Sequence, residues 1–245
     1  MNRVEWYRSA LVSLGLPSLV RRQIQKRFSH SSLCVLTSKK LQFRVVARRG
    51  TSDFMVFDQI FAENEYSQLD RLKNVRFVID CGANVGYSST YFLSTHLQSF
   101  VIAVEPDGGN FDILMRNLQP YGKRSRAVQA AVWPNHEWLR FKDRGQRDNE
   151  WGYSVEQADQ ESGVKSVTIP DLIEMSGFNR ISILKLDIEG AELNLFKSNT
   201  EWLELVDNLV IELHGTECSE VFFKAISGCG FKISTSGELT VCLTG

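Results

Sequence analysis

A strand pattern that runs into a glycine-containing turn, FVIDCGANVGY at residues 77–87, is the feature that most limits how this chain can fold. The apolar, branched residues at its start predict a buried strand, and Asp80 stands at the carboxyl end of that strand. Gly82 and Gly86 let the backbone turn sharply or approach another molecule closely, and the residues that follow predict a helix. In an open α/β sheet, such a strand-to-helix junction is where a ligand binds.

The glycine spacing argues against a dinucleotide. Counted from Gly82, the pattern G-x-G-x-x-G would need glycine at the positions of Asn84 and Tyr87. A nicotinamide-dependent oxidoreductase is therefore only an alternative. A second strand, 100–105, ends in Glu105, about 20 residues after the loop, the separation at which nucleotide-binding folds place an acid on the ribose hydroxyls. We expect Glu105 to bind a ribose.

Strand and helix patterns alternate along most of the chain. Strands are expected at 75–80, 100–105, 125–132, 181–187 and 209–214, helices at 86–95 and 110–118, and a final hairpin at 230–234 and 239–243. Such alternation predicts a parallel sheet with right-handed crossovers and helices on both faces. Residues 138–155 interrupt the alternation, and we expect a short-stranded excursion over the ligand face.

Residues 1–49 are predicted to form an extension of one helix and a strand pair, 33–36 with 41–46, ahead of a main domain at 50–245. We expect residues 49–61, with a helix from Phe54, to fold across the ligand edge of that domain.

The segment 18–28 is a basic amphipathic helix in this interpretation. It either rests on an anionic membrane surface or covers the domain, or it forms a homodimer contact with a second copy of the chain.

Composition excludes several classes of protein. With 28 Lys and Arg against 29 Asp and Glu, the net charge of -1 does not favour nucleic acid as a partner. The five cysteines are odd in number and lack C-x-x-C spacing, so we expect reduced thiols and a cytoplasmic location. Apolar runs stay short of the roughly 20 residues that a transmembrane helix needs.

Three motifs in order resemble the FkbM-type S-adenosylmethionine (SAM)-dependent methyltransferases. They are DCGANVG at 80–86, VEPD at 104–107 followed by Asn110 and Phe111, and LKLDIEGAE at 184–192, the last being the most particular. The resemblance covers roughly Gly50 to the end of the chain. It implies a Rossmann-like, seven-stranded, mostly parallel sheet with an antiparallel C-terminal strand. It also implies SAM as the cofactor and methyl transfer, commonly to an oxygen of a glycan or a small-molecule secondary metabolite.

Residues for SAM and for chemistry follow from these positions. The expected cofactor-binding residues are Asp80, Gly82, Asn84, Gly86, Glu105, Pro106, Trp133, Asp187 and Tyr66. The expected catalytic residues are His214 as general base, since its unperturbed pKa of about 6.5 lies nearest neutrality, and Asp187 as the group that orients it or the acceptor.

Two alternatives stay open at this point. No metal ligand is assigned, but a divalent metal held by Asp187, Glu212 and His214 is the competing arrangement, because carboxylate and imidazole together suit several cations. A catalytically silent SAM-binding module is the other, because the cofactor residues are easier to identify in this sequence than the catalytic ones.

Overall fold

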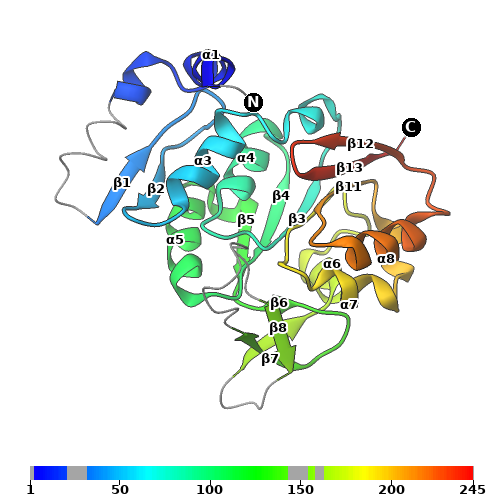
Figure 1. The fold of residues 1–245 in the computed structure, drawn as a ribbon. Helices are drawn as coiled ribbons and strands as arrows, with labels where there is room; N and C mark the ends of the chain where they lie inside the picture. The colour runs from blue at the N-terminus through cyan, green and yellow to red at the C-terminus, as the bar shows by residue number, and fades with distance from the viewer. Residues whose placement is uncertain (1–2, 21–31, 143–153, 158–162, 245) are drawn as a thin grey trace.

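The computed structural model describes residues 3–20, 32–142, 154–157 and 163–244, and its centre is a seven-stranded sheet (Figure 1). The strand order is β12-β13-β11-β10-β3-β4-β5, and β13 runs antiparallel to both of its neighbours. The strands are β3 (Phe77–Cys81), β4 (Phe100–Val104), β5 (Ser125–Val128), β10 (Ile183–Leu186), β11 (Asn208–Glu212), β12 (Lys232–Ser236) and β13 (Leu239–Leu243). The predicted fold class, a mostly parallel sheet with an antiparallel last strand, is confirmed.

Helices cover both faces of this sheet. Successive side chains of each strand point to opposite faces, so the apolar residues of one strand pack with helices on both sides. Val78 and Val101 pack with α3 (Asp53–Phe61), α4 (Tyr87–Thr95) and α5 (Gly108–Leu118) in one hydrophobic cluster. Ile79 and Ile102, one position along, pack in a second cluster with α6 (Ile169–Ser176), α7 (Glu192–Lys197) and α8 (Thr216–Ile226). Burial on both faces explains why these strands are continuously apolar rather than alternating.

The predicted third strand, 125–132, is two strands. β5 ends at Val128, the chain bends at Ala130, and β6 (Ala131–Val132) leaves the main sheet to pair with β9 (Val164–Val167). With β7 (Trp138–Lys142) and β8 (Ser154–Gln157), these strands form a separate four-stranded sheet in the order β6-β9-β7-β8. Residues 143–153 of the expected excursion lie outside the described residues.

The N-terminal extension shares the core of the main domain. α1 (Arg3–Ser13) and the antiparallel pair β1 (Leu33–Leu36) and β2 (Val45–Arg48) contribute to the same cluster as α3 and α4. The second strand of the pair thus begins at Val45 rather than at residue 41. Of the basic segment 18–28, residues 21–28 lie outside the described part of the chain.

α3 packs against α4 and β2, and the expected cover of the ligand edge by residues 49–61 stays a prediction. The ring centroids of Phe57 and Tyr87 lie 5.6 Å apart, and those of Phe61 and Tyr91 lie 5.9 Å apart, which fixes α3 against α4. The apolar side of α3 packs against α4. The residues before and after α3 are therefore the ones that reach the ligand edge.

In the described ranges, no helix combines the length and the apolar character that crossing a membrane would require.

Candidate active site

The register of the parallel strands brings the ends of β3, β4, β10 and β11 to one edge. Cys81 pairs with Leu186 and with Val104, and Leu186 pairs with Ile211. The residues that follow these positions, Gly82, Glu105, Asp187 and Glu212, therefore emerge side by side.

The loop of residues 82–86, called the glycine loop below, is held by close packing within the protein. The N–H groups of Gly82 and Ala83 both donate to the Val104 carbonyl, at 3.0 and 2.9 Å. Gly82 has φ +73°, and a Cβ on it would lie 1.7 Å from the backbone oxygen of Asp187. Gly86 has φ +85°, and a Cβ there would meet the Leu114 side chain at 2.5 Å. Both positions require glycine because the backbone is left-handed and closely packed there.

Glu105 lies behind the loop with its carboxylate oriented by backbone donors. One oxygen accepts from the Asn84 N–H at 2.8 Å, and the other accepts from the Asp107 N–H at 3.0 Å and from the Asn110 side chain at 3.4 Å. Burial raises the pKa of Glu105. Each carboxylate oxygen carries two acceptor sites, so Oε1 is filled and Oε2 has room for one further donor. Pro106, half-buried, follows directly.

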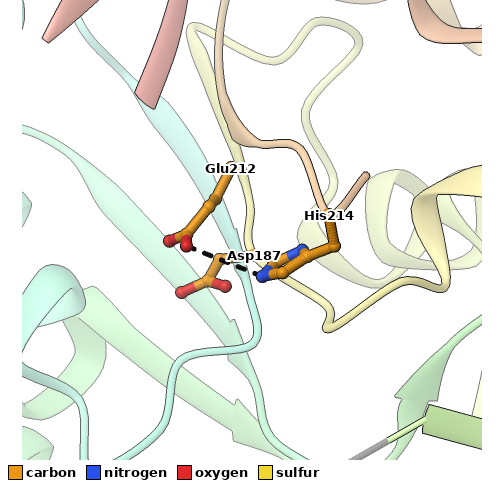
Figure 2. Close-up of side chains that lie close together, drawn as sticks. All are labelled: Asp187, Glu212 and His214. Atoms are coloured by element: carbon orange, nitrogen blue, oxygen red, sulfur yellow. Dashed lines mark ion pairs between the residues drawn. The ribbon is translucent and has the colours of Figure 1, made fainter. Parts of the chain in front are cut away.

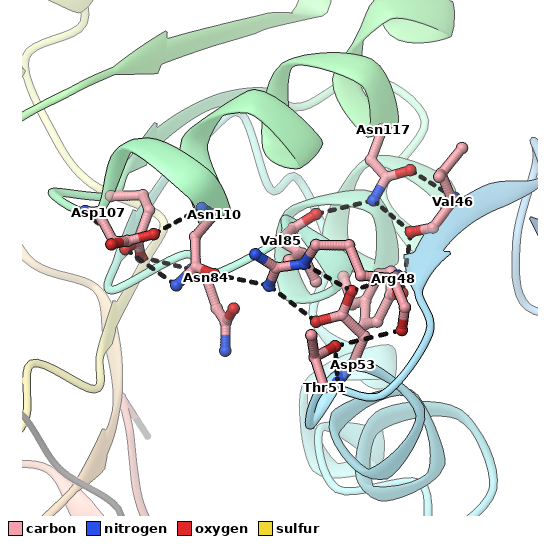
Figure 3. A network of polar contacts seen from close by, with 11 residues as sticks. Val46, Arg48, Thr51, Asp53, Asn84, Val85, Asp107, Asn110 and Asn117 are labelled. Atoms are coloured by element: carbon pink, nitrogen blue, oxygen red, sulfur yellow. Dashed lines mark hydrogen bonds and ion pairs between the residues drawn. The ribbon is translucent and has the colours of Figure 1, made fainter. Parts of the chain in front are cut away.

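A polar network joins this acid to the N-terminal extension (Figure 3). Arg48 donates to the Asn110 side chain at 2.7 Å and pairs with the buried carboxylate of Asp53 at 2.9 Å. Figure 3 shows the Asn84 side chain pointing away from this network. The end of β2 therefore supports the position expected to bind the ribose.

Asp80 is completely buried, and its carboxylate contacts side chains of the core rather than the open edge of the sheet. Oδ2 accepts from the hydroxyls of Ser88 and Ser89 at 2.6 and 2.5 Å, which ties the start of α4 to β3. Oδ1 lies 3.4 Å from the ammonium of Lys185. This side chain holds the loop and α4 in place from beneath.

Sequence reasoning missed Lys185, which is 2% exposed in the middle of β10. Its Nζ donates to the Gly82 carbonyl at 2.7 Å and lies 3.4 Å from Oδ2 of Asp187. Burial lowers the pKa of Lys185, but the carboxylates of Asp187 and Asp80 outweigh it and hold that pKa well above its usual value. The signal in the sequence was a lone lysine inside the apolar strand ISILKL. Lys185 thus links the glycine loop, which follows β3, to Asp187 at the end of β10.

Asp187, Glu212 and His214 come together at the edge, as the strand ends predicted (Figure 2). Their ligand atoms lie within 4.8 Å of one another. Nε2 of His214 lies 3.6 Å from Oε1 of Glu212, and its Nδ1 lies 3.1 Å from the buried Oε1 of Glu192. Burial lowers the pKa of His214, but Glu192, Glu189 and Asp187 raise it more, to about 9. The ring is therefore protonated at neutral pH in the ligand-free protein.

Two more carboxylates crowd the same edge. Burial and the charge of Asp187 raise the pKa of Glu189 to about 7. Burial and the charge of Glu212 raise the pKa of Glu65 to about 7. Glu65 lies in the segment after α3. The backbone oxygen of Glu65 accepts a hydrogen bond from the Ser236 hydroxyl at 2.7 Å. The segment after α3 thus borders the site, and only the folded chain reveals it, because Glu65 is far from Glu212 in sequence.

The two aromatic residues predicted to contact the cofactor pack within the protein. Tyr66 is 4% exposed, and its ring lies against Tyr91 and Phe92, with centroid distances of 5.7 and 5.2 Å. Trp133 is 8% exposed and donates from Nε1 to Glu137 at 3.1 Å. It clusters with Ala191 of the DIEGAE segment, which places the four-stranded sheet beside this edge. Their contact with a cofactor stays a prediction.

Surface hollows elsewhere do not compete with this edge. One of about 690 Å³ lies between α6 and residues 199–205, and one of about 540 Å³ lies between α1 and Lys40. Neither contains a glycine loop or a carboxylate and imidazole pair among its lining residues.

Comparison with known proteins gives a consistent family. Residues 80–233 match the sequence profile described as the methyltransferase FkbM domain. Methyltransferase sdnD of Sordaria araneosa is 28% identical over 190 residues, which cover 64% of this chain and 73% of that protein. Methyltransferase 1 of Beauveria bassiana (strain ARSEF 2860) is 23% identical over 159 residues, covering 56% of this chain and 64% of the relative.

Two solved structures align with this chain at low TM-scores. The METTL16 MTase domain aligns with a TM-score of 0.47 at 12% identity, over 94% of this chain and 79% of that one. Precorrin-6y C5,15-methyltransferase from Geobacter metallireducens GS-15 aligns with a TM-score of 0.45 at 10% identity, over 76% and 89% of the two chains.

Proposed function

Because the chain belongs to the FkbM family of methyltransferases, we propose that it transfers a methyl group from SAM to a hydroxyl oxygen of a glycan or secondary metabolite. The observation that carries this proposal is the sheet edge itself. Its strand ends present an oriented acid, Glu105 after β4, and, two and three strands away, Asp187 after β10 and His214 after β11. The first suits a ribose, and the others suit an acceptor.

The residues present fit SAM. The buried carboxylate of Glu105 is oriented by the Asn84 and Asp107 N–H groups, and its Oε2 can accept a hydrogen bond from a ribose hydroxyl. Gly82 to Gly86 form the loop that would pass beneath the methionine portion, and Lys185 fixes that loop from below. When bound, SAM supplies an electrophilic methyl group on a sulfonium.

Asp187 and His214 are the proposed catalytic residues. Asp187 follows β10 beside the loop, and its side chain is 32% exposed, so its carboxylate can meet an acceptor hydroxyl and take its proton. His214 faces the same space with a side chain 27% exposed. We assign it the orientation of the acceptor oxygen rather than the proton, because the ring already carries one at neutral pH.

Product analysis with methyl-labelled SAM tests the proposal. The protein is incubated with a panel of glycans and hydroxylated metabolites, each beside the analogue in which an amine replaces the hydroxyl. We expect S-adenosylhomocysteine to form with a hydroxyl acceptor and the label to appear in a methyl ether. Asp187→Asn should lower turnover by about 100-fold to 10,000-fold, the range for loss of a general base. Label found on nitrogen, or S-adenosylhomocysteine formation that no acceptor increases, would contradict O-methylation.

A further inference from the structure

The three side chains at the ends of β10 and β11 form a donor set for a metal ion. One carboxylate oxygen of Asp187, one of Glu212 and one ring nitrogen of His214 lie within 4.8 Å of one another (Figure 2). Two ligands on one transition ion, each about 2.1 Å away, lie about 3 Å apart when adjacent and about 4.2 Å apart when opposite, so a shift of about 0.6 to 1.8 Å would close the set. Side chains that are 32%, 29% and 27% exposed can make that shift and leave coordination positions open.

The imidazole is oriented from behind, as metal-binding histidines usually are. Nδ1 of His214 lies 3.1 Å from Oε1 of Glu192, a completely buried carboxylate. With Nδ1 occupied, Nε2 is the nitrogen that faces Glu212, and a metal ion bound there would displace its proton. A carboxylate on the far ring nitrogen fixes the ring and raises its basicity as a ligand. No described residue donates to the other oxygen of Glu192, so this buried acid has negative charge that its neighbours do not fully compensate.

The negative charge at this edge exceeds the cations that the described residues supply. Asp187, Glu189, Glu192 and Glu212 all lie near His214. Beside these four carboxylates, among the described residues, stand protonated His214 and the buried ammonium of Lys185, which lies 3.4 Å from Asp187 and also serves Asp80 and the carbonyl of Gly82. A divalent cation between Asp187 and Glu212 would balance this charge.

We propose that Asp187, Glu212 and His214 bind a divalent transition cation, with Glu192 as the outer residue that positions His214. Two carboxylates with one imidazole suit Mn²⁺ or a neighbouring first-row ion better than Ca²⁺, which takes oxygen ligands, or a structural Zn²⁺ site rich in thiolates. The open positions face the space assigned to the acceptor. There the cation would bind the acceptor oxygen and favour loss of its proton to the second carboxylate oxygen of Asp187, and this role rests on the proposed function.

Direct binding of Mn²⁺ to chelator-treated, full-length protein tests the site without any turnover. The electron paramagnetic resonance signal of free Mn²⁺ is followed as protein is added. We expect one ion bound per chain. Glu192→Gln should weaken binding by about 10-fold to 100-fold, as loss of outer-shell partners does. Glu212→Gln and His214→Ala should weaken it at least as much, and because both side chains are partly exposed they also serve if the buried variant fails to fold.

Glu238→Gln is the matched control, because Glu238 is an exposed acid close enough to influence Glu212 but contributes no ligand atom to the set. It should bind Mn²⁺ as the wild type does. The proposal is overturned if no saturable binding of one ion occurs, or if Glu238→Gln weakens binding as much as Glu212→Gln does.

Turnover separates this proposal from the proposed function. Chelation should remove methyl transfer, and added Mn²⁺ should restore it. Methyl transfer that persists in metal-free protein would overturn the catalytic role of the cation while leaving the proposed function intact. One ion bound per chain with no methyl transfer to any acceptor would have the opposite meaning, because the site would stand and the proposed function would fail.

Discussion

Replacing Lys185 with methionine should destabilise the protein severely, because it leaves a buried charge without its cation. Asp80 is completely buried, its Oδ1 has Lys185 as its nearest positive charge at 3.4 Å, and only Oδ2 receives hydroxyl donors. Removing one partner of a buried ion pair costs about 3 to 5 kcal/mol. The Gly82 carbonyl loses its 2.7 Å donor as well, which adds to the loss.

Urea unfolding at pH 7 measures this loss as a change in the free energy of unfolding. The exposed strand lysine Lys165 supplies the matched control, since Lys165→Met should change the free energy by no more than about 0.5 kcal/mol. Adding Asp80→Asn to Lys185→Met should recover part of the loss, because the completely buried charge is then gone and only the partly exposed Asp187 loses its cation. A loss below about 1 kcal/mol for Lys185→Met, or a double variant less stable than the sum of the single changes, would refute the reasoning.

Two further predictions concern the loop and a buried histidine. Gly82→Ala should destabilise the protein by at least about 1 to 3 kcal/mol from backbone strain alone, and by more because its Cβ meets Asp187. Gly122→Ala, also at positive φ but in open space, should cost only the strain. Equal losses of stability in thermal unfolding would contradict the packing argument. Burial lowers the pKa of His96, so below pH about 6.5 the unfolded chain binds a proton that the folded protein resists, and stability falls as pH falls through that window. His96→Gln should flatten this part of the stability profile, and an unchanged slope would mean that another group causes it.

The fold followed from the sequence because its signals are local. Continuous apolar strands, the helix after Gly86 and the turn between the last two strands each depend on neighbouring residues, and parallel register then decides which strand ends meet. That is why Asp187 and His214 could be placed together in advance. The split of the third strand at Ala130 was not visible, because a run of apolar residues does not show which sheet each half will join.

The residues that support the site could not be predicted in the same way. Arg48 reaches Asn110 across 62 positions, and Lys185 reaches Gly82 across 103. No local pattern encodes such contacts. The polar side chains that stand alone in apolar surroundings, such as Lys185 in β10, are the one trace that these contacts leave in the sequence.

Calorimetric titration of SAM into the purified protein measures whether the edge formed by the glycine loop and Glu105 holds the methyl donor. We expect one molecule of SAM bound per chain. We also expect binding about 1.5 to 3 kcal/mol weaker for Glu105→Ala, the range for hydrogen bonds to a charged group, with Asp112→Ala, an exposed acid on α5, unchanged. A wild-type protein that does not bind SAM, or a folded Glu105→Ala variant that binds it as tightly as the wild type, would mean that this edge is not the SAM site.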